Sequence, residues 1–482
     1  MGVLDKEAIV ARPGYSKWLI PPAALAVHLS IGQVYAFSVF KNSLVAHFGS
    51  SQTAVAWIFS IAILMLGLSA AIFGTWVERS GPRKAMLVAA LCWSVGFLIG
   101  AAGIASGQLW LLYLGYGVIG GIGLGIGYIS PVSTLIKWFP DRPGLATGMA
   151  IMGFGGGALV ASPLSNALMR AYDPAFDPSG KGALAGGTAL WQTFLTLGIG
   201  YGIFMLIGAA LIRLPQGYAD DATAEHRPGR SGALVRAREA IRTRQFWLLW
   251  VVLFCNVTAG IGILEQAAPM IQDFFRTPGG PSTVTAAAAG GFVGMLSLAN
   301  MAGRFVWSSM SDVIGRRPTY MFYLGLGAVL YVLLALFGGT HTAVFVLLAL
   351  VIISYYGGGF ATVPAYLKDL FGTLEVGAIH GRLLTAWSAA GIAGPLIVNG
   401  FLDAAGKPGQ LVAADYRPAL LTMVGLLVVG FVSNLLITDV PEKHHDAGAV
   451  QTLRERTEAM AEAGSTRYRS RDAAADSGGG FE

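Results

Sequence analysis

The sequence has 482 residues, of which 54% are hydrophobic and 12% charged, and its mean hydropathy is +0.62. A soluble protein carries about twice that share of charged residues, so the composition excludes an ordinary soluble domain. The net charge of +6 does not indicate a nucleic-acid partner, because Lys and Arg lie between apolar blocks, as membrane topology requires. Cys92 and Cys255 lie inside apolar segments, so we expect no disulfide framework, no metal site and no other cofactor.

Apolar blocks of about twenty residues follow one another along the chain, and a helix of that length crosses the hydrocarbon core of a bilayer. The blocks lack the two-residue alternation of barrel strands, so we expect an all-α integral membrane protein with twelve transmembrane helices. The predicted spans are 18–40, 53–75, 85–105, 109–136, 146–169, 191–213, 245–269, 286–310, 319–338, 343–367, 380–402 and 417–438.

A long basic stretch separates two groups of six spans. We expect a cytoplasmic N-terminus over 1–17 without a cleavable signal peptide, six-helix bundles over 18–213 and 245–438, a cytoplasmic central loop over 214–244, and a disordered cytoplasmic tail over 439–482. An even number of spans places both termini on one side, and that side collects 25 Lys and Arg against six on the other. The positive-inside rule therefore predicts cytoplasmic termini for this multi-pass protein of the plasma membrane.

The two halves repeat each other at a nearly constant offset. Three pairs of residues, in order along the chain, are 232 to 234 positions apart: Glu78 and Asp312, Pro131 and Pro364, and Pro163 and Pro395. Such a duplication predicts two pseudo-symmetric six-helix bundles with a substrate site between them near the membrane midplane.

The loop after the second span, residues 74–84, contains an acid, two glycines and several basic residues, and a shorter version follows the eighth span. This pattern resembles the signature of the major facilitator superfamily. The basic residues satisfy topology alone, whereas the acid and the glycines do not serve topology and favour a cytoplasmic gate whose ion pairs break during transport. The predicted gate residues are Gly74, Glu78, Arg79, Gly81, Arg83, Lys84, Asp312, Gly315, Arg316 and Arg317.

Within that superfamily the chain resembles the oxalate/formate antiporter family and the related monocarboxylate porters. The resemblance rests on GQVYAFSVF at 32–40, QFWLLW at 245–250, NMAGR at 300–304, GGGFATVP at 357–364 and GAIHGRLLTAW at 377–387. It implies a secondary transporter of small organic anions that works by alternating access, and not an enzyme. The expected partners are a small carboxylate, a proton for symport or a counter-anion for exchange, and the lipid bilayer, with no nucleic acid and no second subunit.

Arg304 is the main candidate for substrate binding. It lies within the eighth span, eight residues before Asp312, which is about 12 Å along a helix. A charged residue at that depth costs about 2.5–3.5 kcal/mol, so an unpaired Arg304 is not expected to face lipid. A guanidinium binds a carboxylate through two parallel hydrogen bonds, and the resemblance implies that role. A structural ion pair or snorkelling to the cytoplasm is the alternative.

Other polar side chains could contact the same anion, because the resembling fold lines its cavity with the first, fourth, seventh and tenth helices. Interhelical hydrogen bonding explains each of them equally well. The oxalate-exchanging members carry a lysine where Trp387 stands, so a single buried cation favours lactate, pyruvate or formate over oxalate, unless Arg382 or His380 adds charge. The further substrate-binding candidates are Gln33, Tyr35, Tyr128, Asn300, Tyr355, Tyr356, His380 and Trp387.

Glu265 and His28 are the titratable groups within the spans and are the candidates for proton coupling. A carboxyl removed from water holds its proton near neutral pH, and histidine titrates there without help. Glu265 at the external mouth and His28 as a neutral spacer are the alternatives. Drug efflux and a transporter-like sensor remain weaker hypotheses, because a deep arginine suits a compact anion and the tail contains no output domain.

Overall fold

The computed structural model describes residues 2, 4–50, 52–176, 184–216, 228–229, 232–277, 280, 282–284, 286–405, 411–453 and 455. Over these residues the chain is helical, and its extended pairings are two isolated bridges, Val10 with Leu214 and Arg276 with Ser282. Eleven helices of this part are long and apolar enough to cross a membrane. The expected all-α membrane fold is therefore confirmed.

The first half contains six membrane-crossing segments. The first segment is α1 (Ile20–Ile31), which a 3-10 stretch (Gly32–Ala36) joins to α2 (Ser38–Phe48). The others are α3 (Gln52–Ser80), α4 (Pro82–Ala105), α5 (Leu109–Leu112) with a π-helical stretch (Tyr113–Gly120) and α6 (Gly121–Trp138), α7 (Pro143–Tyr172) and α8 (Gly187–Leu211). Two of its long helices, α4 and α7, begin with a proline, whose missing N–H costs nothing because the first N–H groups of a helix have no partner within it.

The second half follows the same plan after the short helix α9 (Ala237–Ala240). The expected eighth span is α11, which has 29 residues and is not one of the eleven apolar spans. The expected eleventh span is two helices, α15 and α16, which meet at Leu384. The helices are α10 (Arg244–Phe274), α11 (Ala286–Ile314), α12 (Arg316–Met321) with a π-helical stretch (Phe322–Leu326) and α13 (Gly327–Phe337), α14 (Thr342–Phe371), α15 (Val376–Leu383), α16 (Thr385–Ala405) and α17 (Ala413–Leu435).

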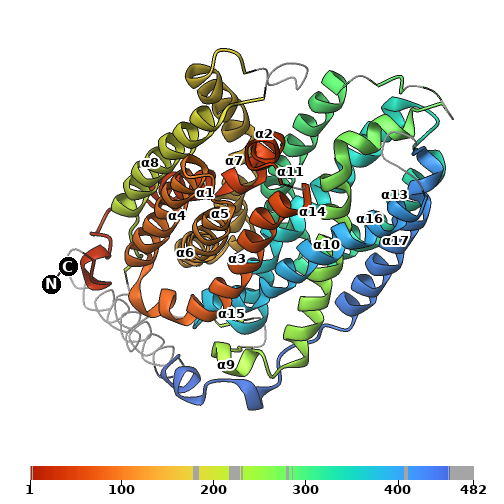
Figure 1. The fold of residues 1–482 in the computed structure, drawn as a ribbon. Coiled ribbons are helices and arrows are strands. Elements are labelled where there is room, and N and C mark those ends of the chain that lie inside the picture. The colour runs from red at the N-terminus through yellow and green to blue at the C-terminus, as the bar shows by residue number, and fades with distance from the viewer. Residues whose placement is uncertain are drawn as a thin grey trace, which may run out of the picture.

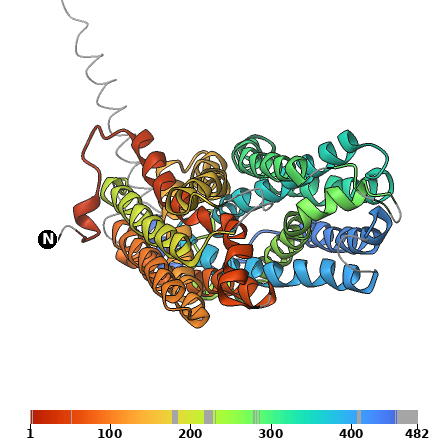
Figure 2. The same ribbon diagram turned by 45° about the horizontal axis from the view of Figure 1, so that its top comes forward.

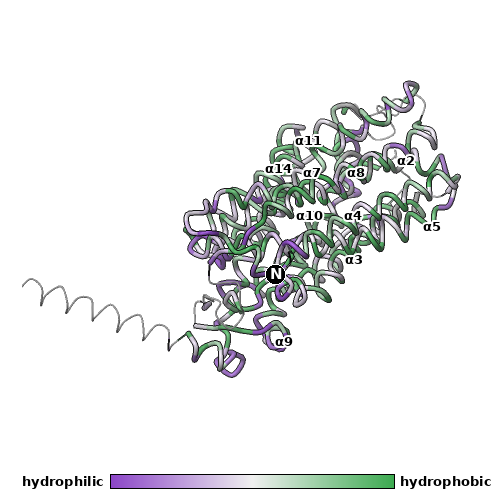
Figure 3. The backbone as a smooth tube through the Cα atoms, turned by 90° about the vertical axis from the view of Figure 1, so that its left-hand side faces the viewer, coloured by the Kyte–Doolittle hydropathy of each residue, from purple (hydrophilic) through white to green (hydrophobic). Residues whose placement is uncertain are grey.

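The two halves lie side by side, the first in red to yellow and the second in green to blue (Figure 1, Figure 2). Small residues let them approach closely: a methyl group on Gly74 of α3 would lie 2.8 Å from the Cα of Ala378 on α15. Along the tube in Figure 3 the long helices are mostly hydrophobic, and hydrophilic residues gather at their ends. The core therefore includes a seam between the bundles as well as the interior of each bundle.

Three segments outside the spans meet at one end of the molecule. The Ala11 N–H donates to the Leu214 carbonyl at 2.9 Å, and the Asp446 N–H donates to the Leu234 carbonyl at 2.7 Å. The segments before α1, after α8 and after α17 are thus on the same side, as an even number of spans requires. The domain boundaries remain predictions, because part of the central loop (217–227 and 230–231) and most of the tail (454 and 456–482) lie outside the described residues.

Candidate functional site

Arg304 lies on α11 at the seam between the bundles, and its side chain is fully buried. Its Nε donates to the Asn300 Oδ1 at 3.0 Å, and its Nη1 donates to the Ile151 carbonyl of α7 at 3.4 Å. Its Nη2 has no hydrogen-bond partner, and no carboxylate among the described residues forms an ion pair with it. A buried N–H without a partner is costly, so this guanidinium has a free donor for an anion.

Aromatic rings from both bundles surround the guanidinium. Its Cζ lies 5.7 Å from the ring centre of Phe154 on α7 and 5.2 Å from that of Phe360 on α14. Trp387 packs against these rings at 5.5 and 4.6 Å, and Tyr35 packs against Phe154 at 5.1 Å. These rings attract the cation and exclude water, which strengthens any charged hydrogen bond made there. We call Arg304 and these four rings, with Tyr128 and Tyr356, the Arg304 cluster.

The hydroxyl groups of the cluster come from both halves of the chain. The hydroxyl oxygens of Tyr35 and Tyr356 lie 3.4 Å apart, and Tyr35, Tyr128 and Tyr356 all interact electrostatically with Arg304. The Tyr128 hydroxyl and the Trp387 Nε1 are buried without a hydrogen-bond partner. The cluster thus offers several donors around a single positive charge.

Two of the expected binding residues contact other neighbours. The Gln33 side chain accepts a hydrogen bond from the Tyr116 hydroxyl at 3.0 Å, within the first bundle. Tyr355 packs against Trp307 at 5.1 Å and Tyr323 at 5.7 Å, within the second bundle. Asn300 contacts the Arg304 side chain and orients it. The sequence pattern therefore groups residues that the structure separates.

The structure also adds Phe154 and Phe360, which the sequence reasoning missed. Phe360 lies inside the motif at 357–364, and Phe154 stands between Gly153 and Gly155. A bulky ring flanked by small residues in a membrane helix was the available signal, since small neighbours let a partner helix approach the ring.

Two histidines lie beside the cluster, and both are buried. The His28 ring nitrogens face the carbonyl oxygens of Ala150 and Tyr128, the second at 3.1 Å. The His380 ring lies 5.8 Å from the Tyr128 ring, and neither of its nitrogens has a hydrogen-bond partner. Glu265 lies on α10, but its side chain is outside the part that the structure describes.

Glu78 joins the two bundles at the end where the connecting segments meet. Its carboxylate accepts hydrogen bonds from the Lys137 ammonium at 2.5 Å, the Ser133 hydroxyl at 2.5 Å and the Gly377 N–H at 2.9 Å. Gly377 belongs to the first turn of α15, where an N–H lacks a helical partner and the helix dipole favours negative charge. The basic partner of Glu78 is thus Lys137 on α6, not the Arg79, Arg83 and Lys84 of its own loop.

Asp312 makes the symmetry-related contact. Its two carboxylate oxygens accept from the N–H groups of Gly144 and Leu145, each at 2.8 Å, in the first turn of α7. It also pairs with Arg316 at 2.5 Å, and Arg316 continues to Asp369 at 3.0 Å. Each acid therefore caps a helix of the opposite bundle, as the internal repeat requires.

The remaining gate residues have local roles. Gly81 and Gly315 have φ angles of +83° and +90°, which favour glycine, and each precedes a helix. The Arg83 side chain donates to carbonyl groups at the end of α8, including that of Ala209 at 3.2 Å, and Arg317 donates to the Leu435 carbonyl. Arg79 and Lys84 are exposed.

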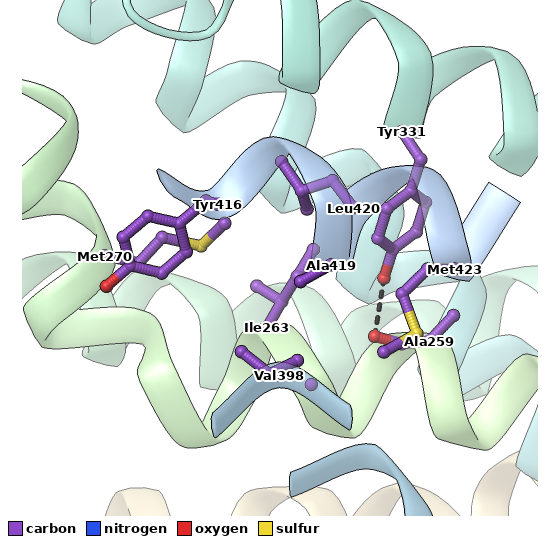
Figure 4. A pocket seen from close by; sticks show the side chains of 10 residues that line it. Ala259, Ile263, Met270, Tyr331, Val398, Tyr416, Ala419, Leu420 and Met423 are labelled. Atoms are coloured by element: carbon purple, nitrogen blue, oxygen red, sulfur yellow. Dashed lines mark hydrogen bonds between the residues drawn. The ribbon is translucent and has the colours of Figure 1, made fainter. Parts of the chain in front are cut away.

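An apolar hollow lies inside the second bundle, between α10, α13, α16 and α17 (Figure 4). Ile263, Met270, Leu420 and Met423 line it, and the hydroxyl of Tyr331 donates to the Ala259 carbonyl at its side. No member of the Arg304 cluster lines this hollow. An anion gains nothing from such a lining, so the hollow is a packing gap and not the candidate site.

Comparison with known proteins agrees with this architecture. The chain is 26% identical over 374 residues to the oxalate:formate antiporter of Oxalobacter formigenes, covering 77% of this chain and 81% of that protein. It is 25% identical over 440 residues to the apicoplast pyruvate carrier 1 of Toxoplasma gondii, covering 81% and 76%. The solved structure of the E. coli fucose:proton symporter superposes with a TM-score of 0.64 at 15% identity, covering 88% of this chain and all of that one.

A family-wide comparison covers nearly the whole membrane part of the chain. The sequence model of the Major Facilitator Superfamily matches residues 23–395 and 284–471. That match, the eleven apolar spans of the described residues and the similarity to transporters indicate a transporter and not an enzyme. The chain is a multi-pass membrane transporter and belongs to the Major Facilitator Superfamily.

Proposed function

We propose that this transporter carries small monocarboxylates of the lactate, pyruvate or formate type across the plasma membrane by alternating access. The observation that carries the proposal is Arg304, fully buried between the bundles with a free Nη2 and with no ion-paired carboxylate among the described residues. A substrate carboxylate would satisfy that donor and cancel the buried charge at once.

The surroundings of Arg304 favour one negative charge over two. Asn300 occupies its Nε and the Ile151 carbonyl occupies one hydrogen of its Nη1, which leaves Nη2 and the second Nη1 hydrogen for a carboxylate. Trp387 contributes an unpaired indole N–H and no charge, so a dianion would retain one uncompensated charge in a dry site. The similarity to an oxalate:formate antiporter and a pyruvate carrier supports a carboxylate substrate, and exchange of carboxylates is the alternative mechanism.

The gate residues would control whether the carrier is open or closed at the end that carries the connecting segments. With Glu78 and Asp312 bound to helix ends of the opposite bundle, the end that carries the connecting segments is closed. Breaking these contacts would let the bundles rock about the Arg304 cluster and expose the anion on that side. The charge distribution supports a cytoplasmic location for this end and for both termini. We propose symport with protons as the coupling mechanism, with Glu265 and His28 as the candidates.

Uptake into liposomes that contain the purified protein tests the proposal. Labelled lactate, pyruvate, formate and oxalate are supplied with and without a pH gradient. We expect uptake of the monocarboxylates, acceleration by external acid, and loss of uptake in Arg304→Ala. Arg238→Ala, at an exposed arginine outside the site, is the matched control and should transport normally.

Three results would contradict parts of this account. Transport of oxalate without lactate would refute the substrate. A need for internal carboxylate without any response to pH would favour exchange. Full activity of a folded Arg304→Ala variant would remove the role of the guanidinium.

A further inference from the structure

The imidazole of His28 lies between two backbone carbonyl groups. Its Nδ1 contacts the carbonyl oxygen of Ala150 on α7, and its Nε2 lies 3.1 Å from that of Tyr128 on α6. A neutral imidazole has one N–H and donates to one acceptor, so its other nitrogen would turn a lone pair toward a carbonyl oxygen. Both contacts are hydrogen bonds only when the ring is protonated.

Close packing holds the ring in that position. A methyl group on Gly153 of α7 would lie 3.1 Å from the His28 Cβ and 2.9 Å from the Leu25 Cδ2, so α1 and α7 approach as closely as a glycine allows. The His28 side chain is fully buried and its two nitrogens are occupied by these carbonyl groups. Protonation of His28 therefore decides whether α6 and α7 are both bonded to α1.

The same two helices connect His28 to Arg304. The Nη1 of Arg304 donates to the carbonyl of Ile151, the peptide group next to that of Ala150, and Arg304 also interacts with the Tyr128 side chain. A protonated His28 and Arg304 are like charges that repel each other. The other titratable groups facing His28 are Tyr128 and His380, and no carboxylate among the described residues interacts with it.

We propose that His28 is the proton-binding residue of this carrier and that a carboxylate bound to Arg304 is what allows His28 to take up the proton. Burial of the ring and, in addition, the like charge of Arg304 oppose protonation of His28 in the empty site, whereas a bound anion offsets that repulsion and attracts the proton, so the loaded site favours it more than the empty one. By linkage, the proton strengthens binding of the anion by the same factor. This inference rests on the proposed function and selects His28 over Glu265.

The charge balance of the step is simple. One carboxylate with charge −1 binds Arg304, and one proton from the same side binds the ring nitrogen of His28 that carries no hydrogen in the neutral form. The pair crosses without net charge, which lowers the cost of moving either ion through a dry seam. On the other side the carboxylate leaves first, the repulsion returns, and the proton passes from His28 to water.

Proton uptake on substrate binding tests this directly. Purified protein in weakly buffered detergent is titrated with lactate while an indicator dye follows the pH and calorimetry follows binding. We expect the wild type to take up protons when lactate binds, and by linkage its affinity for lactate should rise as the pH falls. The His28→Gln variant should bind lactate, at lower affinity, without proton uptake. The Glu265→Gln variant tests the rival candidate and should keep the proton uptake, and His341→Gln, at an exposed histidine outside the site, is the matched control.

The outcomes separate this inference from the proposed function. If no carboxylate binds or crosses in the wild type, the proposed function fails. If lactate binds without proton uptake in the wild type, or if His28→Gln retains the uptake, the role of His28 is refuted. Should His28→Gln not fold, the Glu265→Gln variant still decides: loss of proton uptake in that variant overturns the inference, and retention of the uptake supports it.

Discussion

Three hydrogen bonds to carboxylates join the bundles at their closed end, and they are unequally divided. Asp312 accepts two, from Gly144 and Leu145 at 2.8 Å each, and Glu78 accepts one, from Gly377 at 2.9 Å. The substitutions Asp312→Asn and Glu78→Gln keep the shape of each side chain but remove its charge. Comparing them measures how much each acid contributes to closure.

The expected magnitudes follow from these contacts. A hydrogen bond to a charged group contributes about 1.5–3 kcal/mol and a neutral one about 0.5–1.5 kcal/mol. Glu78→Gln keeps its acceptor toward Gly377, so closure weakens by about 1 kcal/mol, or about fivefold in the open-to-closed ratio. Asp312→Asn has one oxygen left for two N–H groups, loses one bond and weakens the other, and shifts the ratio by about 3 kcal/mol, or about 150-fold.

Distances between spin labels at two exposed positions, Lys84 in the first turn of α4 and Arg242 just before α10, report the opening of this end. We expect a small long-distance population in Glu78→Gln and a dominant one in Asp312→Asn. Thermal unfolding serves as a control, because Glu78→Gln also removes the negative charge that Glu78 places beside the buried Lys137. Equal shifts in the two variants, or a larger shift in Glu78→Gln, would refute the reasoning.

Three further predictions concern the site and the tail. Arg304→Lys keeps the charge but loses the fork, so the KM for monocarboxylate uptake should rise roughly 10- to 150-fold, and an unchanged KM would contradict bidentate binding. Gly155→Ala would place a methyl group 3.0 Å from the Arg304 Nε, so uptake should fall. The control is Gly200→Ala, whose added methyl group would have no other atom within 4 Å and should leave uptake unchanged. Burial raises the pKa of Asp446, but hydrogen bonds from Ala449 and Arg236 outweigh it and hold the pKa below the usual 3.8. The ionised Asp446 therefore contributes its full stabilisation above pH 3.8, and that stabilisation is lost only as the pH falls through the lower folded pKa. Hydrogen exchange at 447–453 should be slow at neutral pH in the wild type and fast at the same pH in Asp446→Asn. Equal exchange in both proteins would contradict this prediction.

Much of the fold could be predicted from local signals. Length and apolar composition mark each span, since a bilayer requires about twenty apolar residues wherever the helix packs. The offset between Glu78 and Asp312 indicated the duplication, and both residues occupy equivalent contacts. The interruption of the eleventh span at Leu384 was not predicted, because neither proline nor a turn motif stands between Gly381 and Thr385.

The site was predicted less well, for a geometric reason. Adjacent residues on a helix point about 100° apart, so Tyr355 and Tyr356 face different neighbours, and Tyr356 alone contacts Tyr35 across the seam. Gln33 and Tyr35 are similarly separated by the 3-10 turn that holds them. Sequence position could not distinguish the members of either pair.

The sequence by itself determined the membrane spans, the repeat, and the presence of a costly arginine in the eighth span. Only the tertiary structure decided that Arg304 has no acidic partner among the described residues, that Phe154 and Phe360 flank it from opposite bundles, and that Glu78 and Asp312 cap helices of the other half. Hydropathy and spacing are properties of a single helix, whereas each of these contacts depends on how two helices from different bundles are rotated against each other.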